Sequence, residues 1–144
     1  MNLRKPQILL SLMALEYFGP ALRDANASHA TNPTWVGHAR FHVVWFIAMM
    51  VGLGLVNLYL IWGRKPAQLR DLAIAAAVEG CTLVGFWSAC VLVDAYGGLI
   101  FVPGIHIKVL GVDENVFTFI IVTTIWLAAV VMLVRAGRST GRAS

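Results

Sequence analysis

The sequence is poor in charge. Only 12% of its 144 residues are Asp, Glu, Lys or Arg, against about 25% in an ordinary soluble domain, whereas 59% are hydrophobic. A chain this short keeps much of its surface exposed when it folds in water, so it cannot bury that much apolar surface in a water-facing core. The composition therefore excludes an ordinary soluble domain and predicts a single membrane domain whose apolar surface faces lipid.

Cysteine is also scarce. The two cysteines, Cys81 and Cys90, lie nine residues apart in one apolar run. On a helix this spacing puts them on opposite sides, which excludes a disulfide bond between them. We expect both to be small hydrophobic side chains without a chemical role.

Long apolar runs are what the sequence has instead. Four of them, at about 6–22, 41–62, 72–93 and 116–134, approach the ~20 residues that a helix needs to cross a bilayer. The first run is the weakest, because Glu16 and Gly19-Pro20 interrupt it, and its basic start also fits a signal peptide. The polar residues after the apolar stretch make an uncleaved helix the better interpretation. The sequence thus predicts an all-α, integral membrane four-helix bundle.

The basic residues predict a topology. The net charge of +4 could indicate nucleic acid, but the basic residues stand at the ends of the apolar runs, so we expect no nucleic-acid partner. The side that carries more Lys and Arg is cytoplasmic. We therefore expect cytoplasmic termini, outer segments at 21–40 and 94–115, and a multi-pass protein of the plasma (inner) membrane or an endomembrane. Eight of the eleven basic residues lie on the inner side, namely Arg4, Lys5, Arg64, Lys65, Arg70, Arg135, Arg138 and Arg142, and three on the outer side, namely Arg23, Arg40 and Lys108.

Histidine gathers on the outer side. All four histidines are there, with several acids: His29, His38, His42, His106, Asp24 and Asp94. His38 and His42 are spaced i, i+4 and share one helix face. Such a pair can supply two metal ligands, or it can move protons near neutral pH. Since no HExxH motif or repeated histidine box accompanies it, we expect no metal and no cofactor.

Two acidic residues fall inside apolar runs. Glu79 lies about two turns into the third run, and Glu16 lies in the later half of the first, toward the outer face. A carboxylate in hydrocarbon is costly, so each is expected to face the bundle interior and to find a partner or a proton. Asn57 is the expected hydrogen-bond partner of Glu79. Leu83, Phe86 and Cys90 continue the inward stripe of Glu79.

One stretch is distinctive: Asp24-x-Asn26-x-Ser28-His29-x-x-Asn32-Pro33-x-Trp35-x-x-His38-Ala39-Arg40-Phe41-His42. Through it the chain resembles an uncharacterised family of small four-helix membrane proteins. That family implies the fold and carries no function to transfer. Sterol-isomerase-like membrane proteins and membrane terpene cyclases are similar in architecture, since they place acidic groups in intramembrane pockets.

The leading functional hypothesis is an enzyme that acts on a lipophilic small molecule inside the bundle by isomerisation, cyclisation, hydration or hydrolysis. A protonated Glu79 or Glu16 would be the acid, and His38 or His42 the base. Asp24, Asp94 and Arg40 would orient these groups. The substrate pocket would be lined by Asn57, Phe86, Trp87, Trp45, His29 and His106.

Three alternatives remain open. The chain is also compatible with a proton-coupled transporter or ion-binding subunit, which with so few helices requires a homo-oligomer. A metal-dependent membrane oxidase would use His29, His38, His42 and Asp24. An accessory subunit would have no chemistry of its own. In each case membrane lipids surround the chain.

Overall fold

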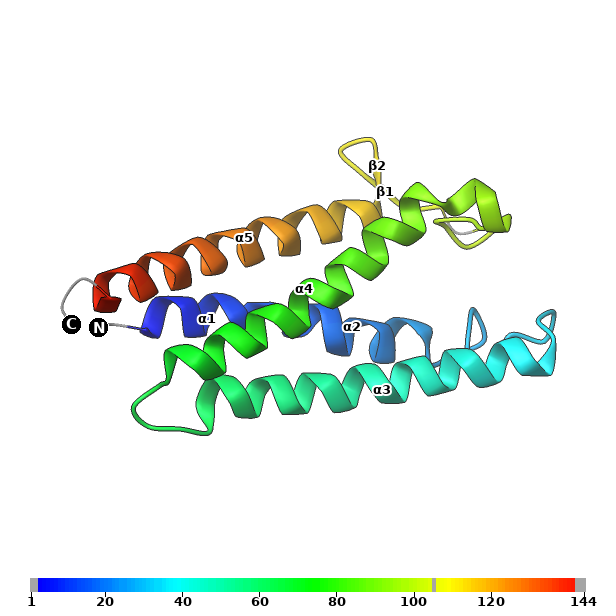
Figure 1. The fold of residues 1–144 in the computed structure, drawn as a ribbon. Helices are drawn as coiled ribbons and strands as arrows, with labels where there is room; N and C mark the ends of the chain where they lie inside the picture. The colour runs from blue at the N-terminus through cyan, green and yellow to red at the C-terminus, as the bar shows by residue number, and fades with distance from the viewer. Residues whose placement is uncertain (1–2, 105, 142–144) are drawn as a thin grey trace.

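The computed structural model describes residues 3–104 and 106–141, so Arg142 lies outside the described residues. Within them the fold is helical apart from one short hairpin (Figure 1). This confirms the predicted all-α class. The elements in chain order are α1 Arg4–Leu12, α2 Ala14–Asp24, α3 Gly37–Trp62, α4 Leu69–Val91, the 3₁₀ helix η1 Val93–Tyr96, β1 Lys108–Val109, β2 Val112–Asp113 and α5 Glu114–Gly141.

Three helices are long and apolar enough to cross a membrane: α3 with 26 residues, α4 with 23, and a 26-residue part of α5. They correspond to the second, third and fourth predicted helices. Helices α3 and α5 extend beyond the predicted 41–62 and 116–134, because helical hydrogen bonding continues past the apolar residues that hydropathy detects. Large apolar side chains are exposed along all three helices, which is consistent with a membrane protein.

The first predicted helix, 6–22, is divided in the structure. Helices α1 and α2 meet at Met13, where the backbone amides of Met13 and Glu16 bond three residues back, to Leu10 and Met13, instead of four. The predicted helix is thus present as two segments, because a short 3₁₀-type turn replaces the α-helical bonding at Met13. Together α1 and α2 still cover roughly 30 Å at 1.5 Å per residue.

The α1–α2 segment packs against all three long helices. One face of the segment carries the buried side chains Leu10, Met13, Glu16 and Tyr17, whereas Leu15 on the other face is exposed. The buried residues recur every three or four positions, as on one side of a helix. The weak hydropathy of this segment therefore reflects polar groups that face the protein interior.

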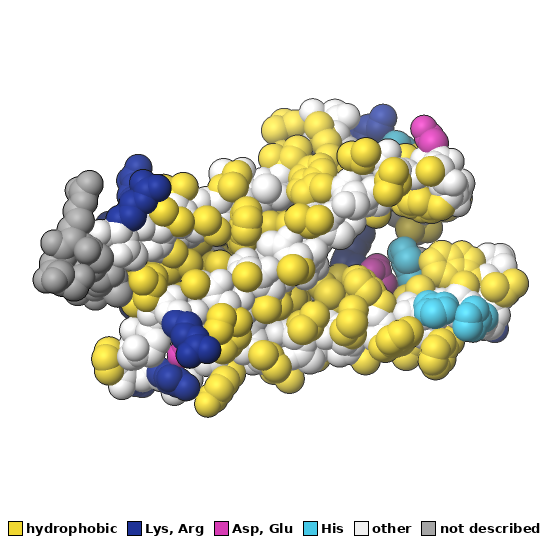
Figure 2. All heavy atoms as spheres, viewed as in Figure 1, with side chains coloured by type: hydrophobic (Ala, Val, Ile, Leu, Met, Phe, Trp, Pro, Cys, Tyr) yellow, Lys and Arg dark blue, Asp and Glu magenta, His cyan; other side chains and the backbone are white. Residues whose placement is uncertain are grey.

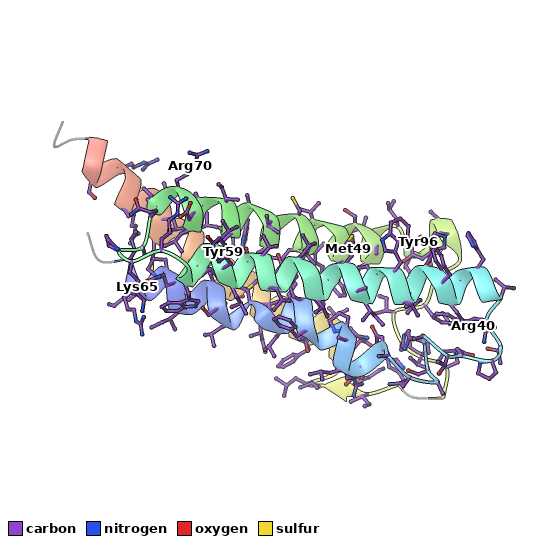
Figure 3. All side chains as sticks on the ribbon, turned by 90° about the horizontal axis from the view of Figure 1, so that it is seen from below. Arg40, Met49, Tyr59, Lys65, Arg70 and Tyr96 are labelled. Carbon is purple, nitrogen blue, oxygen red and sulfur yellow. The ribbon has the colours of Figure 1, made fainter. Side chains whose placement is uncertain are left out.

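Figure 1 shows that α1 begins, α5 ends and the α3–α4 loop turns at one end of the bundle, which we call the basic end. Seven described basic residues define it: Arg4, Lys5, Arg64, Lys65, Arg70, Arg135 and Arg138. Figure 3 shows Lys65 and Arg70 at this end and Arg40 and Tyr96 at the other. That other end, the histidine end, carries the loops with His29 and His106 and the start of α3 with His38 and His42.

Close helix contacts depend on two glycines. A Cβ atom on Gly54 of α3 would lie 2.8 Å from the ring of Phe18 on α2, and one on Gly80 of α4 would lie 2.8 Å from the Trp126 ring on α5. Gly52 has nothing within 4 Å of such an atom. Gly54 thus allows α2 and α3 to approach closely, and Gly80 does the same for α4 and α5.

At the histidine end, helices α3 and α4 move apart. Helix α4 crosses the bundle obliquely and diverges from α3 toward this end (Figure 1). Figure 2 shows the surface hollowed between them, with histidine, acidic and basic side chains in the hollow. Above it, β1 and β2 form a hairpin whose turn residues Leu110 and Gly111 have φ of 52° and 83°. Nothing in the apolar sequence around Leu110 signals this hairpin, and it was not predicted.

Candidate functional site

Glu79 lies at the centre of the bundle. Its side chain is completely buried on α4, and Asn57 of α3 is only 3% exposed. The Asn57 amide Nδ2 donates a hydrogen bond to Glu79 Oε1 at 2.5 Å, which confirms the predicted contact. Among the described residues, Glu79 Oε2 and Asn57 Oδ1 have no hydrogen-bond partner.

Glu16 of α2 lies near Glu79. Its side chain is 3% exposed on α2. The two carboxyl groups are close enough for the charge of Glu16 to act on Glu79. Neither carboxyl oxygen of Glu16 accepts a hydrogen bond from any described residue. Two helices thus bring two acidic groups together in the interior.

Two hydroxyl groups complete the cluster. Tyr17 follows Glu16 on α2, is 1% exposed, and its hydroxyl has no hydrogen-bond partner among the described residues. The hydroxyl of Thr82 on α4 lies beside both Glu16 and Tyr17 without making a well-formed hydrogen bond to them. We call Glu16, Tyr17, Asn57, Glu79 and Thr82 the carboxyl cluster.

The carboxyl cluster has no basic partner among the described residues. Ion pairs between described residues involve other acids, namely Asp24, Asp71, Asp113 and Glu114. An ionised carboxylate in a low-dielectric interior is costly unless it is paired. The two carboxyl groups are therefore not expected to be ionised together without a proton or a cation from outside the chain.

The acids and histidines of the histidine end form separate pairs. His29 Nδ1 lies 3.6 Å from Asp24 Oδ1, and His106 Nε2 lies 3.6 Å from Asp113 Oδ2. Asp24 lies beyond the apolar part of the first helix, and its burial raises the pKa of its carboxyl group, while the charge of His29 opposes this effect. Two titratable pairs thus lie at this end.

The predicted His38–His42 pair exists. The two Nε2 atoms are 3.0 Å apart, and both side chains are exposed on α3. Trp45, one turn further along, is 58% exposed and packs on His42. His42 lies fifteen residues before Asn57, about 22 Å along the helix. The structure thus places this pair on the surface, apart from the carboxyl cluster.

The other predicted site residues are scattered. Arg40 is half-buried near the start of α3, and Asp94 is exposed on η1. Within residues 3–104 and 106–141, no three His, Cys, Asp or Glu side chains come together as metal ligands. Of the predicted catalytic residues, Glu16 and Glu79 lie near each other, and His38 and His42 form a separate exposed pair.

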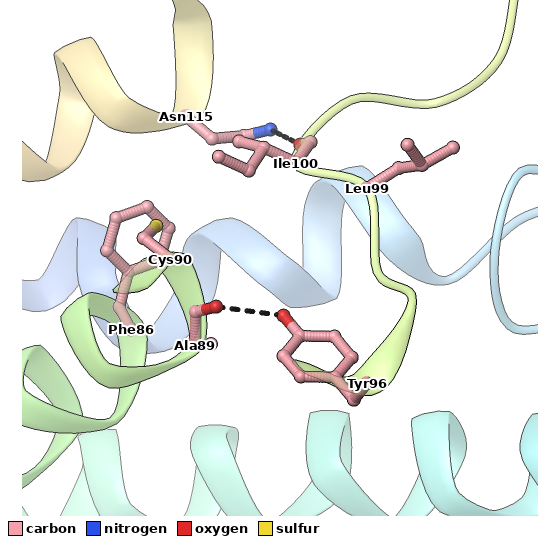
Figure 4. Close-up of a pocket in the computed structure, with 7 residues that line it drawn as sticks. All are labelled: Phe86, Ala89, Cys90, Tyr96, Leu99, Ile100 and Asn115. Carbon is pink, nitrogen blue, oxygen red and sulfur yellow. Dashed lines mark hydrogen bonds between the residues drawn. The ribbon is translucent and has the colours of Figure 1, made fainter. Parts of the chain in front are cut away.

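A separate pocket of about 180 Å³ lies at the end of α4 (Figure 4). Of the predicted substrate-binding residues, Phe86 lines it, and the Trp87 Nε1 instead donates to the Thr123 hydroxyl at 3.0 Å. Two polar side chains of the pocket already make hydrogen bonds to the backbone (Figure 4): Tyr96 donates to the Ala89 carbonyl and Asn115 donates to the Ile100 carbonyl. Most of the residues that line the pocket are apolar, and none of them is acidic.

Sequence reasoning missed two members of the carboxyl cluster. Thr82 is three residues after Glu79 and so shares its helix face, which is a usable signal. Tyr17 is adjacent to Glu16, and adjacency on a helix does not predict a shared face. Only the arrangement of α2 with α3 in the bundle brings its hydroxyl to the other groups.

Comparisons with known proteins supply no relative. No protein-family model, curated protein or solved structure matches the chain. The resemblance of the 24–42 stretch to a family therefore stays a prediction. The carboxyl cluster is the observation from which we infer a function.

Proposed function

We propose that this chain is a multi-pass integral membrane protein that binds and releases protons at Glu16 and Glu79, as a small proton-coupled transporter or the ion-binding subunit of one. Three long apolar helices and the division of charge between the two ends support insertion with the basic end in the cytoplasm. The histidine end then faces the exterior or a lumen.

The observation that carries the proposal is the state of the two carboxyl groups. Three of their four oxygens have no hydrogen-bond partner among the described residues, and the fourth accepts from Asn57. A buried acid kept for structure alone is expected to have its oxygens satisfied. Intramembrane acids of this kind commonly mark proton or ion pathways.

The backbone near Glu16 supports the same proposal. The α1–α2 break at Met13 lies three residues before Glu16, and Glu16 is in the first turn of α2. Pro20 has no amide hydrogen, so the Glu16 carbonyl loses its usual helical donor. Interrupted helices with freed backbone groups are typical of ion sites in membrane transporters.

A proton route from the histidine end fits this geometry. Asp24 and His29 pair at the end of α2, and Asp24 lies eight residues after Glu16, about 12 Å along the helix. Imidazole and carboxyl groups are common members of proton relays in membrane proteins. Because four spans are few for a transporter, we propose that the chain acts as a homo-oligomer.

Proton uptake by proteoliposomes tests the proposal. An imposed membrane potential should drive proton uptake with the wild-type protein, and Glu79→Gln or Glu16→Gln should abolish it, since glutamine fills the same space without a titratable group. His38→Ala serves as the matched control, because His38 is exposed and far from the cluster. Equal uptake by the wild type and both Gln variants would refute the proposal.

The acid–base enzyme stays a second candidate because of the apolar pocket at the end of α4 and the hollow beside it (Figures 2 and 4). A lipophilic substrate fits such a lining. Cys90 in the pocket is eleven residues from Glu79, about 16 Å along α4, so the reacting part of the substrate must extend inward. Turnover of a lipophilic substrate that is lost in Glu79→Gln, without proton uptake in liposomes, would favour this candidate.

A further inference from the structure

We infer that the carboxyl cluster binds a monovalent hard cation, sodium, in competition with protons. The inference rests on the proposed function, because the same two carboxyl groups exchange the proton. It adds the class of ion that the site takes. The supporting observation is that α2, α3 and α4 each contribute a buried oxygen atom that has no hydrogen-bond partner among the described residues.

The unpartnered atoms are all oxygens. Both carboxyl oxygens of Glu16, Glu79 Oε2, Asn57 Oδ1 and the Tyr17 hydroxyl have no hydrogen-bond partner among the described residues. The Thr82 hydroxyl lies beside them. Carboxylate, amide and hydroxyl oxygens are the ligands that hard cations prefer.

Asn57 and Tyr17 distinguish this cluster from a simple pair of acids. Each side chain is more than nine-tenths buried, and each keeps an unsatisfied polar atom in the same interior region as Glu16 and Glu79. Leaving such an atom unpartnered costs about 1–3 kcal/mol. A bound cation satisfies several of these atoms at once, whereas a proton on Glu16 or Glu79 satisfies one acceptor.

Competition with a proton favours a monovalent cation. One divalent ion neutralises two carboxyl groups and leaves no proton to exchange, whereas one sodium ion neutralises them together with one proton, as the proposed function requires. Calcium usually takes six to eight oxygens in flexible loops, and magnesium keeps several of its waters. Here the oxygens come from helix interiors, and Glu79 Oε1 is already held by Asn57, so Glu79 can supply only one oxygen. These conditions favour a monovalent ion.

Packing restricts access from the basic end. A buried apolar cluster lies toward that end of α1, α3, α4 and α5, and it contains Leu3, Leu10, Ile61, Leu72, Ala75, Ala76, Ala129 and Leu133. The hollow between α3 and α4 lies at the opposite end (Figure 2). The cation is therefore expected to reach the cluster from the histidine end.

Modification by dicyclohexylcarbodiimide tests the inference. This hydrophobic reagent dissolves in membranes and modifies protonated carboxyl groups, and peptide mass spectrometry locates the adduct. With the full chain in liposomes, we expect an adduct on Glu16 or Glu79 whose formation slows as NaCl replaces choline chloride at constant ionic strength. CaCl₂ at the same ionic strength should not protect.

Tyr17→Phe removes one oxygen and little else. We expect an unchanged rate of modification in choline chloride, which shows that the fold and the proton site persist, and a half-protecting sodium concentration about five to ten times higher. Tyr59→Phe is the matched control, because Tyr59 is 68% exposed on α3 (Figure 3), and it should behave as the wild type.

The outcomes separate the two proposals. Modification of Glu16 or Glu79 that sodium does not slow overturns the sodium site and leaves the proton site standing. Protection by calcium but not by sodium also overturns the monovalent assignment. An absence of modification at both residues contradicts the proton site itself and the sodium site with it.

Discussion

The hydrogen bond between Asn57 and Glu79 is open to a quantitative test. Asn57→Leu removes the donor and leaves Glu79 Oε1 without a partner in the interior. Glu79→Leu removes the acceptor and leaves the Asn57 amide unsatisfied. Either loss should destabilise the fold by about 1–3 kcal/mol, the usual cost of orphaning one buried partner.

The double variant should recover part of this loss. When both partners are replaced by apolar side chains, neither is left unsatisfied, and the combined change can be nearly neutral. Interhelical hydrogen bonds in membranes average about 0.6 kcal/mol in double-mutant cycles and reach about 1.7. Because this bond is short and fully buried, we expect a coupling free energy near the upper value. Any interaction between Glu16 and Glu79 is lost in both Glu79 variants and cancels in the cycle.

The assay is reversible unfolding in mixed micelles of increasing SDS content, followed by far-UV circular dichroism. The four proteins of the cycle are compared at one pH and one salt concentration. A double variant whose destabilisation equals the sum of the two single values would refute the reasoning, because it would mean that Asn57 and Glu79 do not stabilise each other.

Two further predictions concern packing and titration. Gly54→Ala should reduce the free energy of unfolding by about 1–3 kcal/mol, because the new Cβ would lie 2.8 Å from the Phe18 ring. Gly52→Ala is the control and should not destabilise the fold, because nothing lies within 4 Å of its Cβ position. Equal effects of the two variants in the same micelle assay would contradict the close contact of α2 with α3 at Gly54. The pKa of Asp24 should lie above its ordinary 3.8, so its contribution to stability is greatest at acidic pH and is lost as the pH rises through that raised pKa. His29→Ala should raise the pKa of Asp24 further in an NMR titration, and a lower pKa in this variant would show that the pair does not form.

The helices were largely predictable because hydropathy and periodicity are local properties. Three long apolar helices follow directly from long apolar runs. The cytoplasmic side of the basic end stays a prediction from charge. The break at Met13 was not predictable, since methionine is an ordinary helix residue and the turn depends on how the segment packs. The hairpin at Leu110–Gly111 was missed because leucine rarely adopts a positive φ.

The site was predicted in part. Glu16, Asn57 and Glu79 were identified because polar groups in apolar runs are costly, which makes them visible in the sequence. The sequence alone does not tell whether the histidines share a site with these groups; in the structure His42 is exposed on α3, about 22 Å along the helix from Asn57. Tyr17 and Thr82 belong to the site only through the arrangement of three helices, which no local pattern contains.

The central claim is that Glu16 and Glu79 bind and release protons inside the bundle. Infrared difference spectra of the protein in lipid, recorded between acidic and alkaline pH, measure the carbonyl band of protonated carboxyl groups directly. We expect a carbonyl band whose intensity depends on pH. Glu16→Gln and Glu79→Gln should each reduce this intensity, and His38→Ala should leave it unchanged. A band that is identical in the wild type and both Gln variants would contradict the claim.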